Sequence, residues 1–137
     1  IEELSPNLIV LAGFMRILTP AFVERFSGRM LNIHPSLLPK YKGLNTHQRA
    51  IDANDKEHGA SVHFVTPELD GGPVVLQSKV PIFDQQESQE LAERVQQQER
   101  QMYPLVMKWF CEERLKMIDK KAVLDNQGLA EEGYAIG

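Results

Sequence analysis

Cysteine and long apolar runs are both scarce in this chain. Only one of its 137 residues is a cysteine, Cys111, so an internal disulfide is excluded. No stretch is long and apolar enough to form a signal peptide or a membrane span. We therefore predict a cytoplasmic protein, in a reducing compartment, with no membrane partner.

Positive charge is also in short supply. The chain has 15 Lys and Arg residues against 19 Asp and Glu residues, and the formal net charge of -4 is spread over intermixed residues of both signs. A nucleic-acid partner normally requires a basic stripe or patch, so we predict no such partner. The length and the 42% hydrophobic content are ordinary for a single globular domain.

Two kinds of ligand motif are missing as well. The sequence contains no glycine-rich phosphate loop of the G-x-G-x-x-G or Walker type. Its four histidines form no metal-ligand spacing with Cys111 or with the carboxylates, so we predict no metal site. The chain opens at Ile1 and reaches the strand-like run from Asn7 to Ala12 within a few residues. We therefore expect that an upstream segment is missing.

Hydrophobic patterning predicts alternating strands and helices. Short apolar runs bounded by turn residues predict strands over residues 8–12, 30–33, 59–66 and 74–80. Helical spacing and capping residues predict helices over residues 20–28, 47–53 and 88–113, with Thr46 as the cap of the second and a kink near Pro104 in the third. Residues 115–124 could form a terminal hairpin. The order indicates an α/β fold with a mostly parallel (mixed) sheet flanked by helices.

Polar side chains gather at the end of the second predicted strand. The strand period of two puts Asn32 and His34 on the same face, opposite Leu31 and Ile33. Pro35 restricts His34 to an extended conformation, and open α/β sheets bind ligands at the carboxyl ends of their strands. This pair is therefore a candidate active site, although it could also serve only to satisfy loop amides. Asp70, which precedes Gly71 and Gly72, is equally consistent with a simple turn residue.

Two long motifs resemble those of the folate-dependent formyltransferases. The first is Asn32-Ile-His-Pro-Ser-Leu-Leu-Pro39, and the second is Gly59-Ala-Ser-Val-His-Phe-Val-Thr-Pro-Glu-Leu-Asp-Gly-Gly72. Within the family, the segment from Leu11 to Leu18 and the pair Thr46-His47 are similar to the members that act on glycinamide ribonucleotide. The resemblance covers essentially the whole chain and implies a Rossmann-like formyltransferase fold. It also implies that residues 1–137 are the C-terminal catalytic and folate-binding region, without the N-terminal mononucleotide-binding half and its phosphate loop.

The resemblance implies an activity and a catalytic triad. Members of this kind transfer the formyl group of 10-formyltetrahydrofolate to the amine of glycinamide ribonucleotide. Asn32 and His34 would stabilise the oxyanion that forms when the amine attacks. Asp70 would organise the water through which a proton leaves the amine. The partners are then these small molecules, and a homodimer is one assembly left open.

Binding residues follow from the same resemblance. The residues implied for the folate are Met15, Arg16, Ile17, Leu18, Val23, Met30, Asn32, Thr66, Pro67, Glu68, Leu69 and Asp70. The residues implied for the ribonucleotide are Pro35, Gln96, Gln97, Gln98 and Glu99. Core packing is the alternative for Met15, Val23 and Met30, and a solvated helix face is the alternative for Gln96 and Glu99.

Other residues are less informative. We expect His47 and His63 to support the site, His58 to lie in an exposed loop, and Cys111 to pack in the core of the last helix. Three residues depart from the common family pattern, namely Met30, Asn45 and Pro67.

Two competing functions remain open. The first is a formyltetrahydrofolate hydrolase, in which water attacks instead of the amine. The second is a fragment that binds folate without turnover.

Overall fold

The computed structural model describes most of the chain in several segments. These are residues 9–12, 29–43, 45–66, 72–118, 121–125, 127–129 and 133–136, with only the backbone described for 9–12 and 134–136. The helix predicted over residues 20–28 lies outside the described residues.

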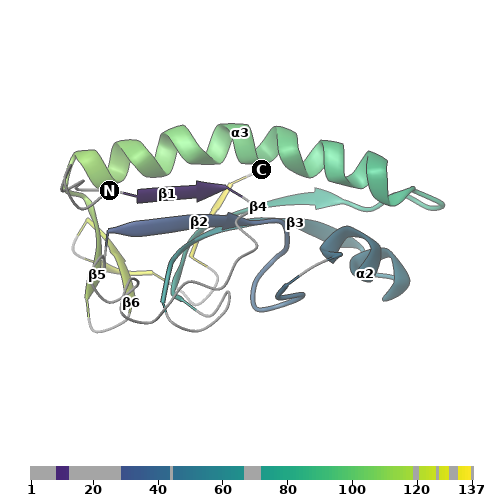
Figure 1. The fold of residues 1–137 in the computed structure, drawn as a ribbon, viewed down its shortest axis with the longest axis horizontal. Coiled ribbons are helices and arrows are strands. Elements are labelled where there is room, and N and C mark those ends of the chain that lie inside the picture. The colour runs from purple at the N-terminus through teal and green to yellow at the C-terminus, as the bar shows by residue number, and fades with distance from the viewer. Residues whose placement is uncertain are drawn as a thin grey trace.

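A five-stranded mixed sheet forms the centre of the molecule (Figure 1). Its strands in spatial order are β1 (Ile9–Ala12), β2 (Met30–His34), β3 (Glu57–Phe64), β4 (Val74–Pro81) and β8 (Tyr134–Ile136). The β1/β2 and β4/β8 pairs are parallel, whereas β2/β3 and β3/β4 are antiparallel. The four predicted strands are confirmed and the sheet is mixed, but its described pairings are evenly divided and do not confirm a mostly parallel sheet. Strand β8 was not predicted.

One long helix covers one face of this sheet. Helix α3 (Ser88–Cys111) runs along the sheet in Figure 1 and continues through the exposed Pro104 without interruption. It buries apolar residues at helical spacing, namely Leu91, Val95, Met102, Val106 and Trp109. Cys111 is the last residue of the helix and is exposed, so the prediction that it packs in the core was wrong. Cys111 follows the buried Trp109 by two residues, which turns it about 200° around the helix axis, away from the buried face.

The short helix α2 (Thr46–Asp52) begins differently from the prediction. Asn45, with φ of 58°, occupies the N-cap position and makes no capping hydrogen bond through its side chain. The Thr46 hydroxyl donates instead to the Pro35 carbonyl oxygen, at 2.5 Å. Thr46 therefore ties the start of α2 to the end of β2 and does not cap the helix.

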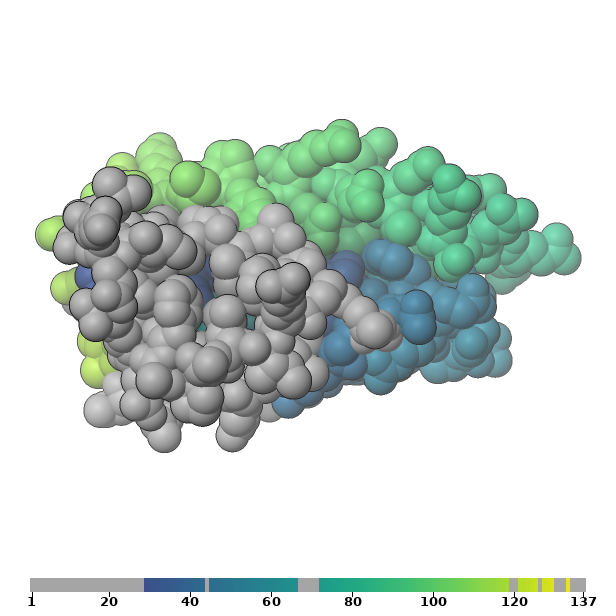
Figure 2. All heavy atoms as spheres, in the orientation of Figure 1, coloured from purple at the N-terminus to yellow at the C-terminus, as the bar shows by residue number. Residues whose placement is uncertain are grey.

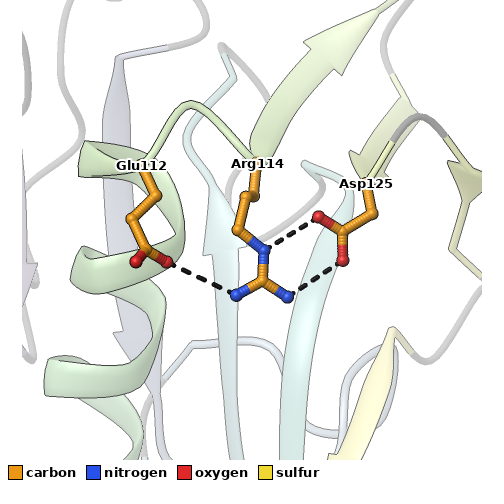
Figure 3. Close-up of polar contacts among 3 residues, drawn as sticks. All are labelled: Glu112, Arg114 and Asp125. Carbon is orange, nitrogen blue, oxygen red and sulfur yellow. Dashed lines mark hydrogen bonds and ion pairs between the residues drawn. The ribbon is translucent and has the colours of Figure 1, made fainter.

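The predicted terminal hairpin is present and belongs to a second sheet. Strands β5 (Leu115–Ile118) and β6 (Lys121–Leu124) pair antiparallel, and β7 (Gln127–Gly128) adds a third strand. Figure 3 shows Arg114, which donates to both carboxylate oxygens of Asp125 at 2.8 and 2.9 Å and to Glu112 at 3.4 Å. These hydrogen bonds raise the pKa of Arg114 and lower the pKa of Asp125. The exposed ion pairs connect the end of α3 to the hairpin.

The two faces of the central strands differ in chemistry. On the face toward α3, β2 and β3 place Leu31 opposite Phe64, and Ile33 opposite Val62, and all four belong to the buried core. On the other face, Asn32 lies opposite His63, and His34 lies opposite Ser61, which in turn lies opposite Gln77. These five polar residues are also buried. The alternation of the strand thus separates an apolar core from a buried polar row.

Two glycines of the second motif permit very close backbone contacts. A Cβ atom at Gly72 would lie 1.8 Å from the Phe64 carbonyl oxygen, and one at Gly59 would lie 1.9 Å from that of Ser78. Both contacts involve backbone atoms, which cannot move aside as a side chain can. Any other residue at position 59 would therefore force β3 and β4 apart, and one at position 72 would push the segment before β4 away from the end of β3.

Candidate active site

Asn32 is held by a neighbouring histidine on the polar face of the sheet. The His63 Nδ1–H group donates to the Phe64 carbonyl oxygen at 2.9 Å, which leaves Nε2 to accept a hydrogen bond from Asn32 Nδ2 at 3.3 Å. Asn32 Oδ1 is buried and finds no hydrogen-bond partner among the described residues. Since buried polar atoms are normally satisfied, this amide marks a place where a ligand could bind.

His34 is held by the loop that follows it. Its Nε2–H group donates to the Tyr41 carbonyl oxygen at 2.8 Å, and the side chain is only 4% exposed. Because a carbonyl oxygen only accepts hydrogen bonds, this contact assigns a proton to Nε2 and fixes the orientation of the ring.

A cavity of about 400 Å³ lies at the carboxyl end of β2, between that strand and α3. Ile33, Pro35 and His47 line one wall, and four residues of α3 line the other, namely Gln96, Glu99, Arg100 and Tyr103. Figure 2 shows the segment around α2, in blue, beside α3, in green, on the face that is drawn. The cavity combines apolar walls with carboxyl, amide, imidazole and guanidinium groups, which suits a small polar ligand.

Two titratable groups of the cavity have altered acidity. Burial raises the pKa of the Glu99 carboxyl group. Burial also raises the pKa of the Tyr103 hydroxyl, although the nearby Ile33 backbone lowers it in part. That hydroxyl forms no hydrogen bond of ordinary geometry within the described part of the chain. A ligand in the cavity would find a carboxyl group and a hydroxyl group able to accept or donate hydrogen bonds.

His47 links the cavity to a second histidine. Its Nδ1 atom lies 3.0 Å from Nε2 of His58, and the two rings meet edge to face with centroids 5.1 Å apart. Burial, with a further contribution from His34, lowers the pKa of His47. Burial is also the main cause that lowers the pKa of His58 to about 4. His58 lies in β3 and is 1% exposed, so the prediction of an exposed loop residue was wrong. The strand begins two residues earlier than the sequence pattern indicated.

The structure brings together part of the predicted set. Asn32 and His34 share one face of β2 as predicted, while Pro35, Gln96 and Glu99 line the cavity. Met30 is buried in β2 and Thr66 is half-buried after β3. Gln98 does not line the cavity, because it accepts a hydrogen bond from the Ser78 hydroxyl at 2.6 Å, and Gln97 is exposed.

The other predicted site residues lie outside the described residues. They are Met15, Arg16, Ile17, Leu18, Val23, Pro67, Glu68, Leu69 and Asp70.

Sequence reasoning missed three residues of the cavity: Ile33 of β2, and two residues of α3, Arg100 and Tyr103. Together with Gln96 and Glu99, the two missed α3 residues occupy positions i, i+3, i+4 and i+7 of α3, which share one helix face. Extending the helical spacing beyond Glu99 would have found both of these.

Comparison with known proteins decides the family. Residues 1–107 match the family model described as formyl transferase. The chain belongs to the formyl transferase family. It is 58% identical to the phosphoribosylglycinamide formyltransferase of Escherichia coli (strain K12) over 135 residues, which cover 98% of the chain and 64% of that relative. The chain therefore spans less than two thirds of the length of this relative.

Solved structures confirm the formyltransferase fold. The phosphoribosylglycinamide formyltransferase of Coxiella burnetii superposes with a TM-score of 0.95 at 50% identity, covering 100% of this chain and 64% of that one. A formyltetrahydrofolate deformylase from Pseudomonas syringae gives a TM-score of 0.84 at 28% identity, covering 90% of this chain and 41% of that one. The family predicted from the two motifs is thus confirmed.

Neither a membrane-spanning helix nor a metal-binding cluster is found in the described segments. None of their helices is long and apolar enough to cross a bilayer. They also contain no group of three or more His, Cys, Asp or Glu side chains arranged to hold a metal ion.

Proposed function

We propose that this formyl transferase moves the formyl group of 10-formyltetrahydrofolate to the amine of glycinamide ribonucleotide, in purine synthesis. The observation that supports this most strongly is the 58% identity to a phosphoribosylglycinamide formyltransferase over nearly the whole chain. The cavity beside the Asn32 and His34 strand provides a place for the acceptor.

Asn32 and His34 stabilise the transition state in this proposal. Attack of the amine on the formyl carbon places negative charge on the carbonyl oxygen, and preorganised donors aimed at that oxygen lower the barrier by about 3–4 kcal/mol each. The bond to His63 uses one of the two N–H groups of the Asn32 amide, so the other can donate to the oxyanion. As an imidazolium, His34 donates through one ring nitrogen while the other keeps its bond to the Tyr41 carbonyl.

The acceptor lies in the cavity between β2 and α3. We assign Glu99 and Gln96 to the polar groups of the acceptor, because both project from α3 into the cavity. Pro35 provides an apolar contact at its edge. The nucleophilic amine would then approach the formyl carbon at the carboxyl end of β2, where His34 lies close to the cavity residue His47.

The donor site and the proton relay follow from the family resemblance. We propose that Met15, Arg16, Ile17, Leu18, Val23 and Met30, together with Thr66, Pro67, Glu68, Leu69 and Asp70, form the folate pocket. Asp70 accepts the proton of the attacking amine through an ordered water. We further propose a cytoplasmic location and a homodimer, with no metal, nucleic-acid or membrane partner.

A product assay separates the transferase from its alternatives. The complete gene product is incubated with 10-formyltetrahydrofolate, with and without glycinamide ribonucleotide, and both the folate product and the formylated amine are measured. We expect one formylated amine for each folate released, and little release without the amine. Equal folate release in both reactions would indicate the hydrolase. Folate binding without turnover by the 137-residue chain alone would indicate a fragment that only binds folate.

A further inference from the structure

A buried serine and glutamine clamp the loop that follows His34. Gln77 in β4 donates through Nε2 to the Leu38 carbonyl oxygen at 2.9 Å and to the Ser61 hydroxyl oxygen at 3.0 Å. The Ser61 hydroxyl also donates to the Ser36 carbonyl oxygen at 2.7 Å and accepts from the Leu38 N–H group at 3.1 Å. Ser61 thus uses its one donor and both of its acceptor positions.

The clamped segment is a loop that pairs with no strand in the described part of the chain. Leu38 is 2% exposed and Ser36 is fully buried, so water cannot easily satisfy their backbone groups. The two side chains take the place of a strand: they satisfy the N–H and C=O groups of Leu38 and the C=O group of Ser36. The position of the loop therefore depends on an amide that projects from β4.

The same loop returns to the His34 ring. The Ser36 hydroxyl donates to the Lys40 carbonyl oxygen at 2.5 Å, which shapes the turn. The next carbonyl oxygen, that of Tyr41, accepts the Nε2–H hydrogen bond of His34 at 2.8 Å. A continuous set of hydrogen bonds thus runs from Gln77 through the loop to the imidazole ring.

We propose that Gln77 is a positioning residue for His34. It acts through Ser61 and the loop of residues 36–41, and it touches neither substrate nor the reacting atoms. The proposal rests on the proposed function only where turnover is measured, because the orientation of the His34 ring can be observed separately. His34, Ser61 and Gln77 occupy one row across β2, β3 and β4, so the sheet itself holds both ends of the arrangement.

The decisive variant removes the donor and keeps the volume. Gln77→Met is close in size to glutamine but cannot donate to Leu38 or Ser61. We expect kcat for formyl transfer to fall by about 10- to 100-fold, because small misplacements of a catalytic group cost that much. The KM values for both substrates should change by less than about twofold, because the binding walls are untouched.

A matched control separates positioning from loss of stability. Leu115→Ala creates a cavity in the core at β5, where Leu115 is 1% exposed and far along the chain from the loop. Both variants should unfold at lower temperature than the wild type, but only Gln77→Met should lose kcat when assayed well below its melting temperature. If Gln77→Met kept normal kcat, the proposal would be overturned and Gln77 would be a structural residue only.

Spectroscopy tests the same proposal without an activity assay. In ¹⁵N NMR of the wild type, the hydrogen-bonded His34 Nε2–H group should give a proton signal protected from exchange, assigned with His34→Ala. We expect this signal to be lost or broadened in Gln77→Met and retained in Leu115→Ala. Its full retention in Gln77→Met would overturn the proposal even if the wild type showed no formyl transfer.

A second variant applies if Gln77→Met does not fold. Ser61→Ala introduces a smaller side chain and removes the hydroxyl that hydrogen-bonds to both Gln77 and the Ser36 carbonyl oxygen. Ser61→Ala should reduce both kcat and the His34 Nε2–H signal, each by a smaller factor than Gln77→Met does. Normal values of both in Ser61→Ala would likewise contradict the proposed chain of contacts.

Discussion

The two faces of strand β2 show how one short segment contributes to both stability and chemistry. Leu31 and Ile33 pack into the apolar core under α3, and Ile33 also borders the cavity. Asn32 and His34 point the other way, where each has a specific polar partner. The apolar face depends on close packing without directed bonds, whereas the polar face requires particular donor and acceptor atoms in particular places. Substitutions on the two faces should therefore affect different measurements.

The largest effect is expected on the apolar side. Phe64 is fully buried opposite Leu31, and Phe64→Ala should lower the free energy of unfolding by about 3–5 kcal/mol. Urea unfolding of the complete gene product measures this change. The fraction that remains folded should keep a near-normal kcat. A large kcat loss in the folded fraction would show that the two faces are not separable.

The opposite result is expected on the polar side. His34→Ala removes a proposed oxyanion donor and should lower kcat by about 10²–10³-fold, equivalent to about 3–4 kcal/mol in the barrier. Folate affinity should change little, because the interaction strengthens only as charge develops. Steady-state kinetics and folate titration check both quantities. A near-normal rate would remove His34 from the mechanism.

The pH dependence of stability should reveal the buried histidine His58. Its pKa is about 4 in the folded protein against 6.5 for the free side chain, mainly because of burial, with smaller effects of His47, Asp55 and His34. Between pH 4 and 6.5, His58 therefore binds a proton more readily in the unfolded chain than in the folded protein. The stabilising contribution is complete above pH 6.5 and is lost as pH falls toward 4, by roughly 3 kcal/mol in all. Urea unfolding at several pH values measures the slope.

A variant identifies the source of that slope. His58→Gln cannot titrate in this range, so its free energy of unfolding should depend less on pH between 6.5 and 4 than that of the wild type. An unchanged slope would assign the dependence to other groups.

The smallest effect is expected at the exposed ion pairs of the hairpin. Arg114→Gln removes the hydrogen bonds to Asp125 and Glu112, but all three side chains are exposed and water replaces much of what is lost. The melting temperature should fall slightly, and less at high salt than at low salt. A loss as large as that of Phe64→Ala would mean that the hairpin anchors the core.

The local sequence pattern correctly predicted those features of the fold that depend only on residues close together in the chain. The period of two placed Asn32 and His34 on one face, and the helical spacing of Leu91, Val95, Met102 and Val106 gave the packed face of α3. These features follow from the geometry of a single strand or helix. The resemblance of two motifs gave the family.

Features that depend on distant residues were beyond such reasoning. The β8 strand pairs with β4 through residues far apart in the chain, and its three residues carry no strong strand pattern. Threonine is a common N-cap residue, but the Thr46 hydroxyl donates to the Pro35 carbonyl oxygen instead of capping the helix. His58 is buried because His47 and β4 cover it, which no local pattern records.

The two close backbone contacts of Gly59 and Gly72 predict how the sequence can vary. In a library that contains every amino acid at position 72, selection for folding alone should return glycine, because any Cβ atom would collide with the Phe64 carbonyl oxygen. Position 34 should accept many residues under that selection and become restricted only when activity is required. If glycine is invariant at position 72 in related sequences, the cause would be the close backbone contact with Phe64. If histidine is invariant at position 34, the cause would be its role in catalysis.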